Sequence, residues 1–600
     1  MNPVYQEWYD KLGKVSESFC LAKWKQVTLH LQFGHKHSCH HPGTHKIDPE
    51  AIKENPSALH NTEFSKETRQ QMLDGIKPKE CGYCWKAEAS GSFSDRIVKS
   101  SSYYGKPFFQ EVVDAGADKD IFPSYLEVSF SNVCNFKCIY CKPHISSKWH
   151  DEAKQGGGYF LEWNGAVNTM NSIEGMEQEG KVPIKNSEEN PYVDAFWKWW
   201  PELYRNLQTF RVTGGEPLLC NDTFGILDHI IDEENPNLNL RLEVNTNMCV
   251  PDTIFNNFLA KLDIIIRERR TAPITIFTSC EAKDKKAEYI RTGLDYTKHM
   301  ESVQKTVDLF VKHKNIPSHY KDPARYNHLT YMCTFNMLSV TSFIDFCKDI
   351  AAIRENIEWA PHMIEHAESA IERATTGDSL GNTWRKHSDQ RLDYLMSTES
   401  PQHYLGTQII RLDIPFLNAP TQLAIETLTD DFGHYFEECY QYLSDSPWFP
   451  TYEVERFKRV WDVYSNNAWD NDTRRKNRSW FVQYVDQLDK RRNTNFLETF
   501  PEYEEFYNYA KGFTTMALYK LFTTPLCGYC TKAERILKNN GLEYEVFDRT
   551  QKNLDYLYEL SPELESTFFT FPQVFVGKKR IGGCDDLELY EEECLGGLGG

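Results

Sequence analysis

Short runs that alternate hydrophobic and polar residues recur along the middle of the chain. They are SYLEVSF (124–130), LQTFRVTGG (207–215), LRLEVNTN (240–247), APITIFTS (272–279), LTYMCTFN (329–336) and IIRLDIPFL (409–417). Alternation over this length is typical of half-buried strands, and longer helical or mixed stretches separate the runs. The pattern predicts a parallel α/β sheet with its functional loops at the carboxyl ends of the strands.

The segments on either side of these runs differ in composition and patterning, and these differences divide the chain into four predicted domains. Residues 1–105 are loop-rich and hold Cys and His residues, residues 120–445 contain the strand-like runs, and residues 446–512 have helical patterning. Residues 516–594 begin with a strand, a turn, a Cys-x-x-Cys pair and a helix. A polar, glycine-bearing insert at 155–190 separates the first two strands, and we expect it to be prone to disorder.

Composition and charge narrow the class of protein. The chain has 600 residues, of which 40% are hydrophobic, and its net charge is −20. This balance argues against non-specific nucleic-acid binding, and no apolar run reaches the roughly 18–20 residues that span a membrane. The amino-terminal residues have no apolar signal core, so we expect a cytoplasmic protein. In that reducing compartment, clusters among the 17 cysteines indicate metal or redox sites instead of structural disulfides.

The first strand is followed by three closely spaced cysteines, Cys134, Cys138 and Cys141, in SNVCNFKCIYC. A short loop would place all three thiolates on one side of a turn, where they could hold an iron–sulfur cluster with one iron left open. From the spacing alone, a zinc knuckle or three unrelated core cysteines are the alternatives.

Polar and glycine residues also follow the next three strands. Gly214, Gly215 and Glu216 end the second run; glycines allow a backbone to approach a ligand, and a carboxylate can accept hydrogen bonds from a ligand ammonium. Asn247 ends the third run, with a simple strand-ending turn as the alternative. Ser279 and Arg291 follow the fourth, and Arg291 suits either a carboxylate ligand or a surface ion pair.

Taken in order, Cys-x-x-x-Cys-x-x-Cys with Tyr140 before its last cysteine, followed by Gly-Gly-Glu-Pro, resembles the radical S-adenosylmethionine (radical SAM) superfamily. The resemblance covers about residues 120 to 430 and implies a partial (β/α)6 barrel. It implies a [4Fe-4S] cluster on the three cysteines, whose open iron takes SAM, and an electron donor such as flavodoxin or ferredoxin. The residues it implies around SAM are Tyr140, Gly214, Gly215, Glu216, Asn247, Ser279 and Arg291.

Four cysteines precede this region, and they would close a second metal site of either iron–sulfur or zinc type. They are Cys20, Cys39, Cys81 and Cys84. The surrounding sequence resembles the twitch module, which is related to SPASM, and this implies an auxiliary [4Fe-4S] cluster. His40 and His41 follow Cys39 and either replace a ligand or lie exposed in a polar loop.

Near the carboxyl end, TTPLCGYCTKAERIL places Cys527 at a strand-to-helix turn and Cys530 within the first helical turn. Free amides and the helix dipole lower the pKa of a thiol in that position, so Cys527 is the expected nucleophile and Cys530 its resolving partner.

Together with TFPQVFVGKKRIGGCDDL, this motif resembles glutaredoxin across about 516–594. The resemblance implies that Pro572 is cis and faces the disulfide, and that glutathione or a thioredoxin-type reductant is a partner. The other positions implied for glutathione are Thr570, Phe571, Gly583, Cys584 and Asp585. Thr524 departs from the family, which often has a lysine there, and a [2Fe-2S] cluster bridged through Cys527 is an open alternative.

These features together predict a radical SAM enzyme with an auxiliary cluster and a fused glutaredoxin. It would cleave SAM reductively to a 5′-deoxyadenosyl radical and take hydrogen from a peptide or small-molecule substrate. The alternative is an iron–sulfur or redox carrier whose barrel performs no chemistry.

Overall fold

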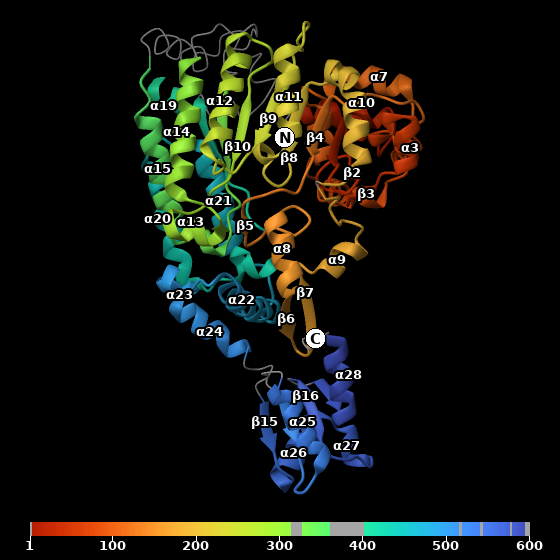
Figure 1. The fold of residues 1–600 in the computed structure, drawn as a ribbon, viewed down its shortest axis with the longest axis vertical. Helices are drawn as coiled ribbons and strands as arrows, with labels where there is room; N and C mark the ends of the chain where they lie inside the picture. Colours follow the sequence, from red (N-terminus) through yellow and green to blue (C-terminus); the bar gives the residue numbers. More distant parts are fainter. Residues whose placement is uncertain are drawn as a thin grey trace. The chain divides into compact units, whose positions relative to one another are not determined.

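The computed structural model describes residues 3–185, 187–313, 327–359, 401–514, 519–539, 544–576 and 579–594. The chain forms two compact units, coloured by sequence in Figure 1. The first unit contains residues 1–155, 173–416 and 433–462, and the second contains residues 156–172, 417–432 and 463–600. Each unit is therefore assembled from segments that are distant in the sequence.

Six parallel strands lie side by side in chain order in the first unit. They are β4 (Tyr125–Ser129), β8 (Thr209–Thr213), β9 (Arg241–Asn245), β10 (Thr275–Thr278), β12 (His328–Met332) and β13 (Ile410–Asp413). Every neighbouring pair among them is parallel, and each strand coincides with one of the six predicted runs. The prediction of a parallel α/β sheet is confirmed.

The alternating pattern sorts the side chains of these strands onto two faces. Leu126 and Val128 of β4 are fully buried on one face, whereas Glu127, between them, lies on the other. On that second face Arg211 of β8 donates from Nε to Asn245 Oδ1 of β9 at 2.9 Å. Strands of a parallel sheet that is covered on both faces have nearly continuous apolar sequences. The alternation seen here therefore indicates that one face of the sheet is polar.

Helix α12 packs against α11 and α14, and α14 packs against β12. The helices of the first unit are α1 (Pro3–Gly13), α2 (Ala22–Lys25), α3 (Pro49–Glu54), α4 (Glu63–Leu73), α5 (Gly82–Ala89), α6 (Asp95–Ser100), α7 (Phe109–Ala115), α8 (Ser147–Gly156), α9 (Ile173–Gln178), α10 (Pro191–Asn206), α11 (Asn221–Asp232), α12 (Asp252–Arg267), α13 (Asp284–Ile290), α14 (Tyr296–Lys312), α15 (Phe343–Glu355), α19 (Pro401–Ile409), α20 (Gly433–Asp445) and α21 (Thr451–Ser465). A membrane-crossing length of apolar residues occurs in no helix of the described ranges.

The amino-terminal residues extend the same sheet. Strand β1 (Gln26–His30) runs parallel to β4, and β2 (His35–His37) and β3 (His45–Lys46) continue the sheet in antiparallel order. The predicted amino-terminal domain thus shares both a sheet and a compact unit with the strands that follow it. The sequence QVTLH of β1 alternates in the same way as the six predicted runs, and our sequence analysis missed it.

The insert at 155–190 is ordered where the structure describes it, so the expectation of disorder is wrong. It forms an antiparallel hairpin of β6 (Tyr159–Trp163) and β7 (Ala166–Met170), followed by α9. Asn164 and Gly165 connect the strands, both with positive φ angles. An Asn-Gly pair between two short runs is a strong hairpin signal, and it was available in the sequence.

A helix of the second unit supports this hairpin. Gln487 of α22 (Asn471–Arg492) accepts from the Phe160 amide at 3.1 Å and donates to the Phe160 carbonyl at 2.8 Å. Gln483 makes the same pair of bonds to Glu162, at 2.8 and 2.9 Å. Four helical residues rise about 6 Å and two strand residues about 6.7 Å, so the two spacings match. The outer edge of β6 is therefore paired with side chains.

The rest of the second unit ends in a separate four-stranded sheet of order β15-β14-β16-β17. Strand β14 runs parallel to β15 and antiparallel to β16, and buried side chains fill both faces of the sheet. The remaining elements are α23 (Phe496–Thr499), α24 (Glu504–Thr514), β14 (Tyr519–Phe522), α25 (Gly528–Asn539), β15 (Tyr544–Phe547), α26 (Gln551–Leu560), α27 (Glu563–Ser566), β16 (Gln573–Val576), β17 (Lys579–Gly582) and α28 (Cys584–Cys594).

The glutamine pairing predicts a local effect of mutation. In Gln483→Ala/Gln487→Ala, the amides of Phe160 and Glu162 lose their partners, and the hairpin should open more easily by about 1–3 kcal/mol. Hydrogen exchange followed by mass spectrometry should show faster exchange in 159–163. Gln441→Ala, which removes an exposed glutamine of α20, is the matched control, and unchanged exchange in the double variant would contradict the pairing.

Candidate functional site

The three cysteines that follow β4 line one cavity of about 700 Å³, a volume that includes its open mouth. The cavity collects residues from the carboxyl ends of four strands. Among its lining residues are Cys134, Cys138, Cys141, Gly214, Gly215, Glu216, Asn247, Ser279 and Arg291. Of the residues that the sequence grouped with these cysteines, Tyr140 lies beside the cavity, and its hydroxyl donates to Glu281 Oε1 at 3.0 Å.

The paired glycines pack against the cysteine loop. Gly215 N donates to Ser131 O at 3.2 Å, and Glu216 N donates to Val133 O at 2.7 Å. A Cβ atom on Gly215 would overlap the carbonyl oxygens of both Val133 and Asn132. We expected these glycines to allow a ligand to come close to the backbone. In the structure, they allow two segments of backbone to come close to each other.

Gly293 has the same role on the other side of the loop. Its φ angle is +110°, and a Cβ atom there would lie 2.7 Å from Asn135 O. The neighbouring β11 (Arg291–Thr292) pairs with β5 (Lys137–Cys138), with Arg291 opposite Cys138. The cysteine loop is thus held between two glycine-containing turns.

Glu216 is buried and engaged by backbone amides. Its carboxylate accepts from Leu218 N at 3.0 Å and from Asn247 N at 2.6 Å. Burial raises its pKa to about 7, against the effect of these hydrogen bonds. Glu216 lines the cavity, and it also ties the end of β8 to the end of β9.

Asn247 reaches back to the cysteine loop. Its Nδ2 donates to Asn135 Oδ1 at 2.8 Å, and Asn135 Nδ2 donates to Cys249 O at 3.0 Å. Asn135 was not predicted as a site residue, although it directly follows Cys134 in the sequence. Asparagine pairs of this kind leave no spacing signal, because they join residues that are 112 positions apart.

Arg291 forms a buried ion pair with Glu281. Arg291 Nε and Nη2 donate to Glu281 Oε2 at 3.1 and 2.6 Å, and the two side chains are 7% and 1% exposed. Burial alone would lower the pKa of Arg291, and the adjacent carboxylate more than reverses this effect, so the pKa of Arg291 lies above its usual range. The alternative of a surface ion pair is wrong, and Glu281 is a residue that the sequence analysis missed.

The four amino-terminal cysteines line a second cavity, of about 370 Å³. Cys81 immediately precedes α5 and Cys84 lies in its first turn, while Cys20 and Cys39 come from loops. Burial raises the pKa of Cys20 to about 12 and that of Cys81 to about 11, so both thiols are protonated at neutral pH. Within the described ranges, no group of three or more His, Cys, Asp or Glu residues has the geometry of a single-ion site.

The two histidines after Cys39 differ in position. His41 lines this second cavity, where Nε2 lies 2.9 Å from Asp95 Oδ2 and the ring stacks on Tyr83. His40 is exposed. The charged residues Lys23, Arg96 and Lys99 also line the cavity.

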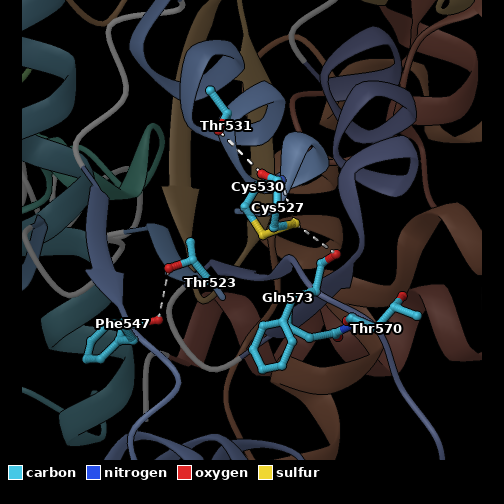
Figure 2. The surroundings of a disulfide bond; sticks show 8 residues. Thr523, Cys527, Cys530, Thr531, Phe547, Thr570 and Gln573 are labelled. Atoms are coloured by element: carbon cyan, nitrogen blue, oxygen red, sulfur yellow. Dashed lines mark hydrogen bonds between the residues drawn. A yellow bond between two sulfur atoms is a disulfide. The ribbon is translucent and has the colours of Figure 1, made fainter. Parts of the chain in front are cut away.

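The third site is a disulfide between Cys527 and Cys530 in the carboxyl-terminal sheet domain (Figure 2). Cys527 directly precedes α25 and is half-buried, whereas Cys530 is buried. Cys530 N donates to Cys527 Sγ at 3.1 Å, and the same sulfur lies 3.6 Å from Phe571 O. An amide aimed at this sulfur at a helix amino terminus favours a thiolate at Cys527 after reduction.

Comparisons with known proteins fall on this segment. The family model Glutaredoxin matches residues 520–581. A glutaredoxin of Pseudomonas aeruginosa is 34% identical over 71 residues, which are 12% of this chain and 81% of that protein. Through this domain the chain belongs to the glutaredoxin family.

Two further relatives give the extent of the likeness. Glutaredoxin 3 of Escherichia coli K12 is 32% identical over 83 residues, 14% of this chain and 94% of the relative. Hybrid peroxiredoxin hyPrx5 of Haemophilus influenzae is 40% identical over 74 residues, 12% of this chain and 27% of the relative. The likeness thus covers the glutaredoxin domain and about a quarter of the hybrid protein.

Of the ligand positions expected in the glutaredoxin domain, Phe571 lies next to the disulfide, with its carbonyl oxygen 3.6 Å from Cys527 Sγ. The Phe571–Pro572 peptide is cis, and Gln573 Nε2 donates to Thr570 O at 2.7 Å (Figure 2). Gly583 N donates to Asp586 Oδ2 at 2.7 Å, just before α28. Cys584 packs into the domain core, whereas Asp585 is exposed.

The glycine packing at the first cavity predicts that Gly215→Ala disrupts the cysteine loop. The new Cβ must displace backbone, at a cost of about 1–3 kcal/mol, so the midpoint of thermal unfolding should fall in a melting curve. Gly512→Ala on an open helix surface should not lower this midpoint. An unchanged midpoint in Gly215→Ala would show that the loop tolerates displacement.

Proposed function

We propose that the chain is a radical SAM enzyme with an auxiliary iron–sulfur cluster and a fused glutaredoxin domain. One observation carries the proposal: three closely spaced cysteines and residues from the ends of four parallel strands converge on one cavity. The sequence shows only that these residues follow one another along the chain. The fold brings them together around one cavity, although they extend from position 134 to position 291.

The donor set of this cavity suits the proposed cofactors. Cys134, Cys138 and Cys141 would hold a [4Fe-4S] cluster and leave one iron for SAM. When bound, the cluster and SAM would supply radical chemistry that removes hydrogen from a substrate. Polar side chains of Asn247 and Ser279 line the same space and would orient the polar groups of SAM.

The chain's own residues prepare the cavity before any ligand arrives. Glu216 and Asn247 are fixed by backbone hydrogen bonds, so they need little reorganisation. The burial of Cys134 and Cys141 raises the pKa values of both thiols, so cluster assembly must release their protons. Beyond the cavity, Arg211 and Glu127 lie on the polar face of the sheet and would orient a polar substrate.

The second cavity would hold the auxiliary cluster. Cys20, Cys39, Cys81 and Cys84 supply four thiolates around one space, and neighbouring Lys23, Arg96 and Lys99 would offset their negative charge. Four cysteine thiolates hold either an iron–sulfur cluster or zinc, and the resemblance of the surrounding sequence to the twitch module is why we favour a [4Fe-4S] cluster.

The glutaredoxin domain would carry out thiol–disulfide exchange. After reduction, the Cys527 thiolate attacks a partner disulfide, forms a mixed disulfide and releases one partner thiol. The Cys530 thiol, on losing its proton, then displaces the second partner thiol and closes the Cys527–Cys530 disulfide, so two electrons pass to the partner. Glutathione or a thioredoxin-type reductant would return the pair to the dithiol form.

The enzyme proposal is tested by SAM cleavage. After anaerobic reconstitution and reduction with dithionite, the full chain should convert SAM to 5′-deoxyadenosine, measured by chromatography. The triple variant Cys134→Ala/Cys138→Ala/Cys141→Ala should make none and keep roughly half of the iron, the share of a second cluster. A fully loaded wild-type chain that never cleaves SAM would refute the enzyme proposal, and an iron-free triple variant would refute the auxiliary cluster.

The thiol chemistry predicts unequal effects of two serine substitutions. Cys530→Ser should trap a mixed disulfide with glutathione at Cys527, because the resolving thiol is gone; the intact-protein mass should rise by one glutathione adduct. Cys527→Ser should form no adduct at Cys530, which is buried. Equal adducts at both positions would overturn the assignment of Cys527 as nucleophile.

A further inference from the structure

The guanidinium of Arg291 lies between a buried carboxylate and a cysteine of the first cavity. Nε and Nη2 donate to Glu281, and Nη1 points at Cys138 Sγ at 3.9 Å. Backbone pairing sets this arrangement, since Arg291 is opposite Cys138 and Ile139 N donates to Ile290 O at 2.9 Å. The backbone pairing therefore places Arg291 next to Cys138, in addition to any attraction between their charges.

Glu281 is fixed from two sides. It is almost completely buried, and it accepts hydrogen bonds from Arg291 and from the Tyr140 hydroxyl. Tyr140 belongs to the cysteine loop, so Glu281 joins the turn after β10 to that loop. The carboxylate thereby fixes both the direction of the guanidinium fork and the end of the loop.

The charge balance around Arg291 comes from this pair. The other titratable groups that interact with Arg291 include Tyr140, Cys138, Cys280, Cys141, Cys333 and His299, and Glu281 has the strongest interaction. The pair places one guanidinium, 3.9 Å from Cys138 Sγ, against one carboxylate on its other edge.

We propose that Glu281 is a positioning residue that holds Arg291 against Cys138, and that the charges of this pair set the reduction potential of the cluster on the three cysteines. This inference rests on the proposed function. The couple is a one-electron step: the cluster gains one electron from a low-potential donor, and no proton moves. A nearby cation stabilises the more negative reduced form and raises the potential, whereas a nearby anion lowers it.

The two partners should therefore shift the potential in opposite directions. Glu281→Gln removes the anion, keeps the shape of the side chain and should raise the midpoint potential. Arg291→Gln removes the cation beside the sulfur and should lower it, while Arg291→Lys keeps the charge and should restore most of the difference. We expect each glutamine variant to change the ratio of reduced to oxidised cluster at a fixed potential by about tenfold, or about 59 mV for one electron.

The experiment is a redox titration of the reconstituted full chain without SAM, followed by electron paramagnetic resonance. The signal of this cluster is the one that the triple cysteine variant lacks. Glu50→Gln, which removes an exposed carboxylate paired with Lys53, is the matched control and should leave the potential unchanged. Opposite shifts for the Glu281 and Arg291 variants support the inference, and no shift or shifts of the same sign overturn it.

Two further results keep the test decisive. If Glu281→Gln loads no cluster, the double variant Glu281→Gln/Arg291→Gln supplies a neutral pair of similar size. Its midpoint potential should be lower than that of Arg291→Lys, because the cation that it lacks is the charge nearer to the cluster. Equal midpoint potentials would overturn the inference. If the wild-type chain forms no cluster on these cysteines, the proposed function itself fails. If the wild-type chain forms the cluster and cleaves SAM but the variants have unchanged midpoint potentials, only the role of the pair is refuted.

Discussion

The close packing of the cysteine loop between two glycine-containing turns is the constraint on which the first cavity depends. Gly215 and Gly293 approach the backbone of residues 131–136 from two sides, at distances that leave no room for a Cβ atom. Gly215 follows β8 and Gly293 follows β11, so the loop after β4 is packed between the segments that follow these two strands. This packing fixes the backbone that carries the three cysteines.

This constraint gives several residues two roles. Glu216 and Asn247 line the cavity, and their hydrogen bonds also connect the strand ends to each other and to Asn135. A substitution there changes the architecture and the chemistry together. Loss of the proposed activity alone therefore does not identify a ligand contact, whereas the iron content and midpoint potential of the proposed cluster separate the two roles.

The strands were predictable because their signal is local: one polar face and one buried face give alternation within each segment of four or five residues. The cavity residues were predictable as members of motifs, but their contacts were not. Glu281 has no local signal, because its partners Arg291 and Tyr140 lie 10 and 141 residues away. The hairpin was missed although its Asn-Gly turn was visible, because helix residues more than 320 positions later complete its edge.

Burial also separates the two kinds of sulfur chemistry in the chain. Cys20, Cys81 and Cys84 are buried, and burial raises their pKa values, so without metal they are poor nucleophiles. Cys527 lies at a helix amino terminus, and Leu526 and Tyr529 beside it are exposed. Exchange requires a reachable thiolate, so the glutaredoxin disulfide is suited to an external partner. The buried cysteines are suited to a metal that replaces their protons.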